Sequence, residues 1–211
     1  MARTPSNTEL PLGTLCPAFE LPDSISGKAY GRDDIFAGPE DPRSGLLVAF
    51  LSVHCPFVQH MEQAFSTLLL EFADQIATVA ICSNTLTTPE DAPAHMRAQA
   101  LRLHWAADQH NPVIPYLIDE SQETAREFHA ACTPDLYLFN AQYELVYHAQ
   151  FDATRPYRTS DEKAGIERHP QIHKPAHGAD LLRAIENLTV GHPPLQDQKP
   201  SLGCNIKWHA Q

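Results

Sequence analysis

Cys55 is the residue of this sequence that is best placed to do chemistry. It follows an unbroken apolar run, residues 46–51, whose length suits a strand buried on both faces. Pro56 comes next, and proline is favoured in the first turn of a helix because its missing N–H would have no partner there. Apolar residues then recur at helical spacing, at Phe57, Met61, Phe65, Leu68, Leu69 and Phe72. The pattern predicts a cysteine where a buried strand meets the start of a helix.

A cysteine in that position is expected to be redox-active. The thiolate is the reactive form of the side chain, and the positive end of a helix dipole favours negative charge. The pKa of a free cysteine, ~8.5, falls to roughly 3.5–7.5 in such sites. The plain alternative is that Cys55 packs as a small buried hydrophobe. We predict a reactive thiol.

The composition of the chain limits its expected number of domains, its partners and its compartment. A chain of 211 residues predicts one domain with a substantial core. Its formal net charge of −11 argues against nucleic acid and anionic membranes as partners. The first ten residues show no apolar signal core, so a reducing cytoplasm is the expected compartment. Five widely spaced cysteines then indicate catalytic, sensing or buried thiols and no disulfide scaffold.

The remaining pattern alternates strands and helices. Strands are expected at 76–82, 114–119, 135–139 and 144–151, and helices at 94–106, 121–131 and 177–188. Residues 1–14 are expected to be a polar lead-in. We expect a single domain over residues 1–190 and a C-terminal extension over 191–211 that packs on it.

Three strings resemble the peroxiredoxin-like branch of the thioredoxin family, the redoxin or AhpC/TSA group. Residues 54–58, His-Cys-Pro-Phe-Val, are similar to its active-site signature, and residues 16–23 to its opening segment. Residues 200–208, Pro-Ser-Leu-Gly-Cys-Asn-Ile-Lys-Trp, are similar to its ending. The resemblance covers nearly the whole chain. It implies a thioredoxin-like α/β fold, with a central mixed sheet flanked by helices, an N-terminal extension and a C-terminal arm.

The resemblance also implies where a substrate would bind. The step from Thr133 to Pro134, just before an apolar strand, resembles the cis-proline that faces the active cysteine in thioredoxin folds. An ordinary trans proline at the start of an edge strand is the alternative. Together with His54 and Pro56, Thr133 and Pro134 are therefore our candidates for binding a substrate or partner.

Ser52 stands where this group often carries the first cysteine of a Cys-x-x-Cys pair. Its hydroxyl is predicted to hydrogen-bond the Cys55 thiolate, as the threonine of peroxiredoxins does. Peroxiredoxins also use an arginine near the strand that follows Cys132, and this chain has Pro134 and Asp135 there. That departure counts against efficient peroxide reduction.

A nucleophilic thiol needs a second thiol to complete a redox cycle. Cys132, which precedes the Thr-Pro step, is the first candidate for this resolving role. Cys204, in a tail that could fold over the site, is the second. For both, structural packing is the alternative.

The sequence therefore predicts a thiol-dependent oxidoreductase that acts on peroxides or protein disulfides through Cys55, with antioxidant and redox-homeostasis roles. The alternative is a catalytically weak redox-sensing or partner-binding module. The expected electron donor is a thiol of thioredoxin or glutathione type, no cofactor is expected, and a homodimer is left open. His169, His173 and His177 are spaced like metal ligands, but intervening prolines favour a solvated loop and no metal site.

Overall fold

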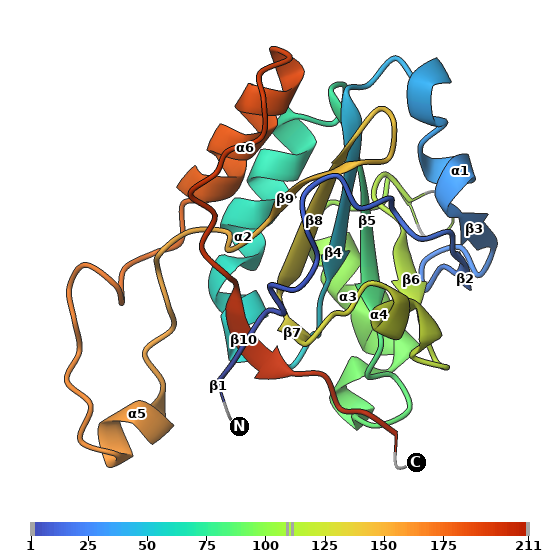
Figure 1. Ribbon diagram of the computed structural model, residues 1–211. Coiled ribbons are helices and arrows are strands. Elements are labelled where there is room, and N and C mark those ends of the chain that lie inside the picture. The colour runs from blue at the N-terminus through green and yellow to red at the C-terminus, as the bar shows by residue number, and fades with distance from the viewer. Residues whose placement is uncertain (1–2, 109, 111, 210–211) are drawn as a thin grey trace.

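The computed structural model describes residues 3–108, 110 and 112–209. Its centre is a five-stranded mixed sheet in the order β6-β5-β4-β8-β9 (Figure 1). Strand β4 pairs in parallel with β5, which pairs in parallel with β6, whereas β8 is antiparallel to both β4 and β9. The strands are β4 (Gly45–Phe50), β5 (Ile76–Cys82), β6 (Tyr116–Ile118), β8 (Asp135–Asn140) and β9 (Leu145–His148).

Both faces of this sheet are covered, as the continuous apolar run of β4 predicts. Alternate side chains of β4 enter two separate hydrophobic clusters, with Leu47 and Ala49 in one and Leu46 and Val48 in the other. The first cluster packs under helices α2, α3 and α6, and the second under α1 and α4. The helices are α1 (Arg32–Ile35), α2 (Pro56–Glu71), α3 (Pro93–Arg102), α4 (Glu123–Glu127) and α6 (Ala179–Thr189).

The predicted helix over 121–131 is shorter in the structure. Helix α4 covers Glu123–Glu127 and is flanked by two residues in the left-handed region, Gln122 (φ 61°) and His129 (φ 51°). Backbone of this hand cannot continue a right-handed helix. The composition of residues 121–131 therefore predicted a helix correctly but overestimated its length.

The two ends of the chain meet in a second, three-stranded sheet, ordered β1-β10-β7. Strand β10 (Leu202–Asn205) lies between β1 (Arg3–Pro5) and β7 (Cys132–Thr133) and is antiparallel to both. Figure 1 shows the two termini at the same end of the molecule. The lead-in predicted over 1–14 thus contains a strand, which the sequence could not show because its partner lies at the far end of the chain.

The remaining elements are short. Strands β2 (Glu20–Pro22) and β3 (Ala29–Gly31) form a hairpin, and two 3₁₀ turns, η1 (Gly38–Glu40) and η2 (Pro89–Asp91), lie in loops. Helix α5 (Thr159–Lys163) belongs to a lobe that projects from the body between β9 and α6 (Figure 1). No helix in the described part of the chain combines the length and the apolarity needed to span a bilayer.

Candidate functional site

Cys55 is the N-cap residue of α2, with Pro56 in the first helical position. Its carbonyl accepts the first helical hydrogen bond, from the N–H of Gln59 (2.9 Å). The side chain therefore lies where the unpaired N–H groups of the first turn converge, as the sequence predicted. Its exposed fraction is 0%, so the thiol is covered from solvent.

Thr133 and Pro134 cover one side of this cysteine. The first residue of β8, Asp135, pairs with Phe50 at the end of β4, so the two residues before it lie beside the turn that leads to Cys55. The Thr133–Pro134 peptide bond is cis. The Cys55 thiol donates a hydrogen bond to the carbonyl oxygen of Thr133 (3.0 Å). The sheet register thus brings together the two residues of the predicted binding corner and the cysteine.

Strand β10 brings a second thiol to the same place. Cys204 is paired with Thr133 in the β10–β7 register, and its side chain is within hydrogen-bonding reach of Cys55. The approach of the two strands depends on Gly203, because a Cβ atom at that position would lie 2.0 Å from the Thr133 carbonyl oxygen. A glycine next to the cysteine therefore lets the C-terminal arm reach the site.

The two thiols have opposite acidities. Burial opposes ionisation of Cys55, but hydrogen bonds from the Cys204 thiol and the backbone N–H of Val58 outweigh it, and the pKa of Cys55 is lowered to about 6. The interaction with Cys55, together with burial, raises the pKa of Cys204. Cys55 is therefore the thiol that ionises, and Cys204 keeps its proton and donates it to the thiolate.

Thr133 has a further donor for the ionised state. Its hydroxyl is buried and has no hydrogen-bond partner among the residues that the structure describes. The bond from Cys55 to the Thr133 carbonyl requires the sulfur proton and is lost when the thiol ionises. The neighbouring hydroxyl then contributes to lowering the pKa of Cys55.

His54 and Ser52 form a polar cluster with Asp91 on the other side of the cysteine. The Ser52 hydroxyl donates to Asp91 Oδ2 (2.8 Å), and His54 Nδ1 lies 3.0 Å from the same oxygen. The backbone N–H of His54 donates to Asp91 Oδ1 (3.2 Å). The hydroxyl proton of Ser52, which we expected on Cys55, is thus directed to the carboxylate.

His54 and Asp91 shift each other's pKa toward the charged forms. The hydrogen bond to Asp91 raises the pKa of His54 against the effect of burial, and the charge of Cys55 adds to the rise. Burial alone would raise the pKa of Asp91, but the bonds from His54 and Ser52 lower it. Asp91 therefore favours the charged form of His54. Sequence reasoning missed Asp91, which lies in the short turn η2 of a proline-rich loop and carries no local motif.

Cys132 is turned away from this arrangement. It is adjacent to Thr133 in β7, and successive side chains of a strand point to opposite faces. Its thiol donates to the Pro134 carbonyl (3.5 Å), and burial raises its pKa. Cys16 and Cys82 are also buried, and burial raises the pKa of Cys16 to about 12. All five cysteines are free thiols.

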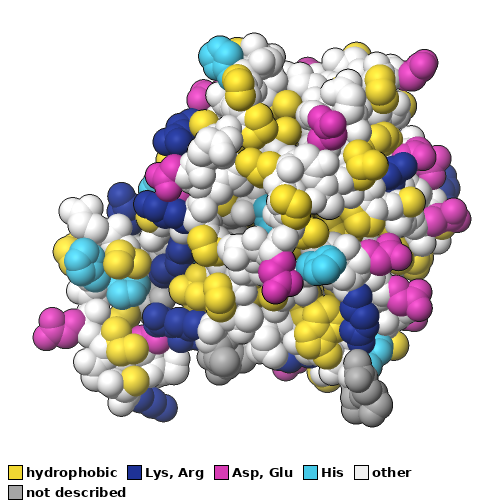
Figure 2. All heavy atoms as spheres, viewed as in Figure 1, with side chains coloured by type: hydrophobic (Ala, Val, Ile, Leu, Met, Phe, Trp, Pro, Cys, Tyr) yellow, Lys and Arg dark blue, Asp and Glu magenta, His cyan; other side chains and the backbone are white. Residues whose placement is uncertain are grey.

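A cation that the sequence did not indicate lies near the thiol pair. Arg158, at the edge of the α5 lobe, has its guanidinium 5.5 Å from the ring of Phe57 and bonds to Asp161 (2.9 Å). The bond to Asp161 raises the pKa of Arg158, and the charge of the Cys55 thiolate adds to the rise. Figure 2 shows Lys and Arg side chains gathered where the lobe meets the body, on a chain whose net charge is strongly negative.

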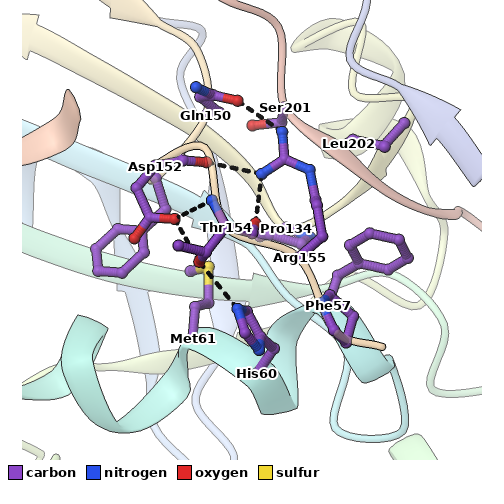
Figure 3. Close-up of a pocket in the computed structure, with 12 residues that line it drawn as sticks. Phe57, His60, Met61, Pro134, Gln150, Asp152, Thr154, Arg155, Ser201 and Leu202 are labelled. Atoms are coloured by element: carbon purple, nitrogen blue, oxygen red, sulfur yellow. Dashed lines mark hydrogen bonds between the residues drawn. The ribbon is translucent and has the colours of Figure 1, made fainter. Parts of the chain in front are cut away.

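Two hollows flank the cysteine. A cavity of about 20 Å³ beside Phe57 and Pro134 has room for little more than one water molecule. Figure 3 shows Arg155 bonded to Gln150, Asp152 and Thr154 at its wall. On the side of His54 lies an open cleft of about 490 Å³, lined mainly by apolar surface. The described residues hold no cluster of side chains able to bind a metal ion.

Comparison with known proteins places the fold. No protein-family model matches the sequence, and no curated protein matches it. Among solved structures, a putative protein disulfide isomerase from Bacteroides thetaiotaomicron is 14% identical over 86% of this chain and 92% of its own, with a TM-score of 0.54. At that identity the likeness concerns the fold alone. The predicted thioredoxin-like α/β fold is confirmed.

Two solved structures are much more similar. An uncharacterized conserved protein from Geobacillus kaustophilus is 32% identical over 100% of this chain and 98% of its own, with a TM-score of 0.83. A hypothetical protein from Sinorhizobium meliloti is 35% identical over 99% of this chain and 100% of its own, with a TM-score of 0.81. The chain belongs to the same family as these two full-length relatives.

Proposed function

We propose that the protein is a thiol oxidoreductase in which Cys55 attacks the substrate and Cys204 resolves the product. The observation that carries this proposal is the position of the two thiols, with Cys55 at the start of α2 and Cys204 opposite Thr133 in the β10–β7 register. A thiol whose pKa is about 6 is mainly ionised at neutral pH, and its partner thiol is held protonated within hydrogen-bonding reach. This pairing supports a Cys55–Cys204 disulfide as the oxidised state.

With a protein disulfide as substrate, the Cys55 thiolate attacks one sulfur and the other leaves as a thiolate. The new bond is a mixed disulfide between Cys55 and the substrate. Cys204 then loses its proton and attacks Cys55, which releases the substrate sulfur bound in the mixed disulfide as a thiol and leaves Cys55–Cys204 oxidised. A thiol donor of thioredoxin or glutathione type returns the pair to the reduced state by the same exchange.

With a hydroperoxide, the Cys55 thiolate attacks the terminal oxygen and the O–O bond breaks. The leaving alkoxide needs a proton, and we assign its supply to His54, whose pKa the bond to Asp91 raises. Cys55 becomes a sulfenic acid, and Cys204 displaces water from it to form the same disulfide. Both substrates thus pass through one oxidised product, and we propose a reducing cytoplasm as the compartment that keeps the pair ready.

Disulfide mapping after mild peroxide treatment tests the proposal. We expect a Cys55–Cys204 bond in the wild type and in Cys132→Ser, and none in Cys204→Ser. A Cys55–Cys132 bond would instead support Cys132 as the resolving thiol, as the sequence suggested. If Cys55 stays unmodified while other thiols oxidise, the proposed function is wrong.

A second candidate function is a partner-binding module that does not turn over. The observation in its favour is burial, since Cys55, Thr133 and Cys204 are each at most 2% exposed. Peroxidase and disulfide-reductase rates of the wild type and Cys55→Ser separate the two. Equal rates favour the module, and a loss of rate in the variant favours the oxidoreductase.

A further inference from the structure

The C-terminal arm does more than bring Cys204 to the site, because it also occupies the exit from it. Strand β10 pairs with β7 only at Cys204–Thr133 and Asn205–Cys132. The pairing nevertheless covers the peptide group next to Cys55 and leaves that thiol with no exposed surface. A protein substrate cannot reach Cys55 while β10 is in this position.

We propose that β1 and β10 form a hinged flap, and that β10 occupies the place of an extended segment of the partner protein. The proposal rests on the function proposed above and names its substrate class: a protein whose reactive cysteine follows a glycine in an extended segment. Strand addition at the edge of a sheet is a common way of binding such segments, with backbone hydrogen bonds supplying affinity and side-chain positions supplying specificity. Here the edge is β7.

The seated arm shows what the partner segment has to look like. Cys204 lies opposite Thr133 and reaches Cys55, so an incoming cysteine in the same register reaches the same sulfur. The residue before it has to be glycine, because at Gly203 a Cβ would lie 2.0 Å from the Thr133 carbonyl oxygen and 3.1 Å from the nitrogen of Pro134. Both of those contacts are with backbone, which cannot move aside as a flexible side chain can.

The flap is built to move as one piece. Strands β1 and β10 share three residue pairs, and the N–H of Ser6 also donates to the carbonyl of Ser201 (2.9 Å). The attachment to β7 is shorter, at two pairs. Beyond it, the arm is held by the N–H of Ile206, which donates to Ala131 (3.2 Å), and by Lys207, whose N–H donates to Asn84 (2.8 Å) and whose carbonyl accepts from Gln122 (2.9 Å). Opening breaks these bonds and lifts the buried Ile206 out of a hydrophobic cluster, so the closed arm is the favoured state.

Opening and closing of the flap would also complete the reaction. With the flap open, Cys55 attacks the partner's disulfide and the partner's second sulfur leaves. When β10 returns to β7, Cys204 meets the mixed disulfide in the register seen here and attacks Cys55. The partner's cysteine then leaves as a thiol, and the returning arm displaces the segment that carried it.

A chromogenic peptide tests the register. The probe is a peptide of residues 200–207 whose cysteine is joined through a disulfide to 5-thio-2-nitrobenzoate, so that attack by Cys55 on the peptide sulfur releases the coloured thiolate. The control peptide is identical except that alanine replaces the glycine. We expect the wild-type protein to react about tenfold faster with the glycine peptide, as a clash with fixed backbone implies. The Cys55→Ser variant supplies the background, and 2-mercaptoethanol should react equally with both peptides.

Equal rates for the two peptides would overturn the flap proposal. If neither peptide reacts above the Cys55→Ser background, the flap proposal also fails. The proposed function stands in that case if peroxide still produces the Cys55–Cys204 disulfide, and it fails too if no disulfide forms. The two ideas are therefore separable.

Substitution of the arm's own glycine gives a second readout. We expect Gly203→Ala to unseat β10 and to speed alkylation of Cys55 by iodoacetamide about tenfold at pH 9, where Cys55 is mostly ionised with or without the Cys204 contact. Gly31→Ala, in the distant β2–β3 hairpin and with only a flexible carboxylate as its nearest contact, is the matched control and should leave the rate unchanged. A folded Gly203→Ala protein with the wild-type rate would contradict the flap.

Discussion

Two neighbourhoods hold Cys55, and they differ in kind. On one side are Thr133 and Cys204, which come from two-residue and four-residue strands and offer a carbonyl, a hydroxyl and a thiol. On the other side are His54 and Asp91, a charged pair held by three hydrogen bonds within the turn and η2. The first neighbourhood combines β7, from the middle of the chain, with β10, near its C-terminal end, and the second lies against the helix start.

The two neighbourhoods contribute differently to the chemistry of the Cys55 thiolate. The arm side supplies the largest stabilising contact to the thiolate and also the thiol that can resolve it, so its chemistry depends on β10 being in place. The side of His54 and Asp91 is built from the turn and η2, although the charge of Lys207 on the arm also acts on His54, where it lowers the pKa. When β10 leaves the site, Cys55 is uncovered, and the neighbouring His54 still favours its ionised form.

The largest effect on reactivity is expected from Cys204→Ala. Removing the thiol that donates to Cys55 removes the first of the contacts that lower its pKa, which should rise from about 6 by roughly one unit. Alkylation by iodoacetamide at pH 6 should slow about fivefold to tenfold, as the thiolate fraction falls. The pH profile of alkylation measures the shift directly.

Cys132→Ala is the matched control for this prediction, because it removes a thiol one residue from Thr133 that bonds elsewhere. Its profile should coincide with that of the wild type. A shift of equal size in both variants would mean that packing around β7 sets the acidity of Cys55 and that the Cys204 hydrogen bond does not.

Asp91→Asn is expected to have a smaller effect on reactivity and a larger one on the fold. Without the carboxylate, His54 loses the contact that raises its pKa, so the thiolate loses a positive neighbour at neutral pH. We expect the pKa of Cys55 to rise by less than one unit. The free energy of unfolding should fall by about 2–3 kcal/mol, because a buried pair is broken.

Glu90→Gln is the matched control, since Glu90 is the exposed carboxylate directly before Asp91. It should leave both quantities near their wild-type values. Urea unfolding measures the free energy of unfolding of the two variants, and alkylation as a function of pH measures the pKa of Cys55 in each. If Asp91→Asn changes the alkylation profile of Cys55 more than Cys204→Ala does, then His54 and Asp91 lower the pKa of Cys55 more than Cys204 does.

The ion pair should also give stability a defined pH window. The folded-state pKa of His54 is raised, so its contribution is complete below the unfolded value of ~6.5 and is lost as pH rises through the folded value. The folded-state pKa of Asp91 is lowered, so its contribution is present above ~3.9 and is lost as pH falls through the folded value. The difference in unfolding free energy between wild type and His54→Gln should therefore be greatest between about pH 4 and 6.5. A difference that does not change up to pH 9 would show that His54 is not charged in the fold.

The sequence showed one of these neighbourhoods better than the other. The apolar run of β4, Cys55 and Pro56 form a local pattern, and the helix start followed from it correctly. The pairing of Thr133 with Cys204 is not local, since 71 residues separate partners that only the sheet register brings together. Strand alternation, which turns Cys132 away while Thr133 faces the site, also required knowing that β7 is a strand.

Asp91 shows a second limit. An acidic residue in a proline-rich loop has no signal of its own, and its role appears only when the loop is folded back against the turn before α2. The fold class was within reach because apolar periodicity marks the strands and helices and because the strings around Cys55, Pro134 and Cys204 resemble the thioredoxin family. The role of Asp91 could not be predicted, because tertiary contacts decide which of the many carboxylates is buried at the site.

Ser52→Ala is expected to have the smallest effect, and it separates two interpretations of this position. If the hydroxyl acted on the sulfur, as the resemblance to peroxiredoxins implied, its removal would raise the pKa of Cys55 markedly. In the structure the hydroxyl donates to Asp91 (2.8 Å), so the variant should lose about 1 kcal/mol of stability through the less well satisfied carboxylate. The alkylation profile of Cys55 should stay within a few tenths of a pH unit of the wild type, because the contacts of the sulfur with Cys204, Val58 and Thr133 are untouched. A shift as large as that of Cys204→Ala would place the hydroxyl on the thiolate in solution and return Ser52 to the role that the sequence suggested.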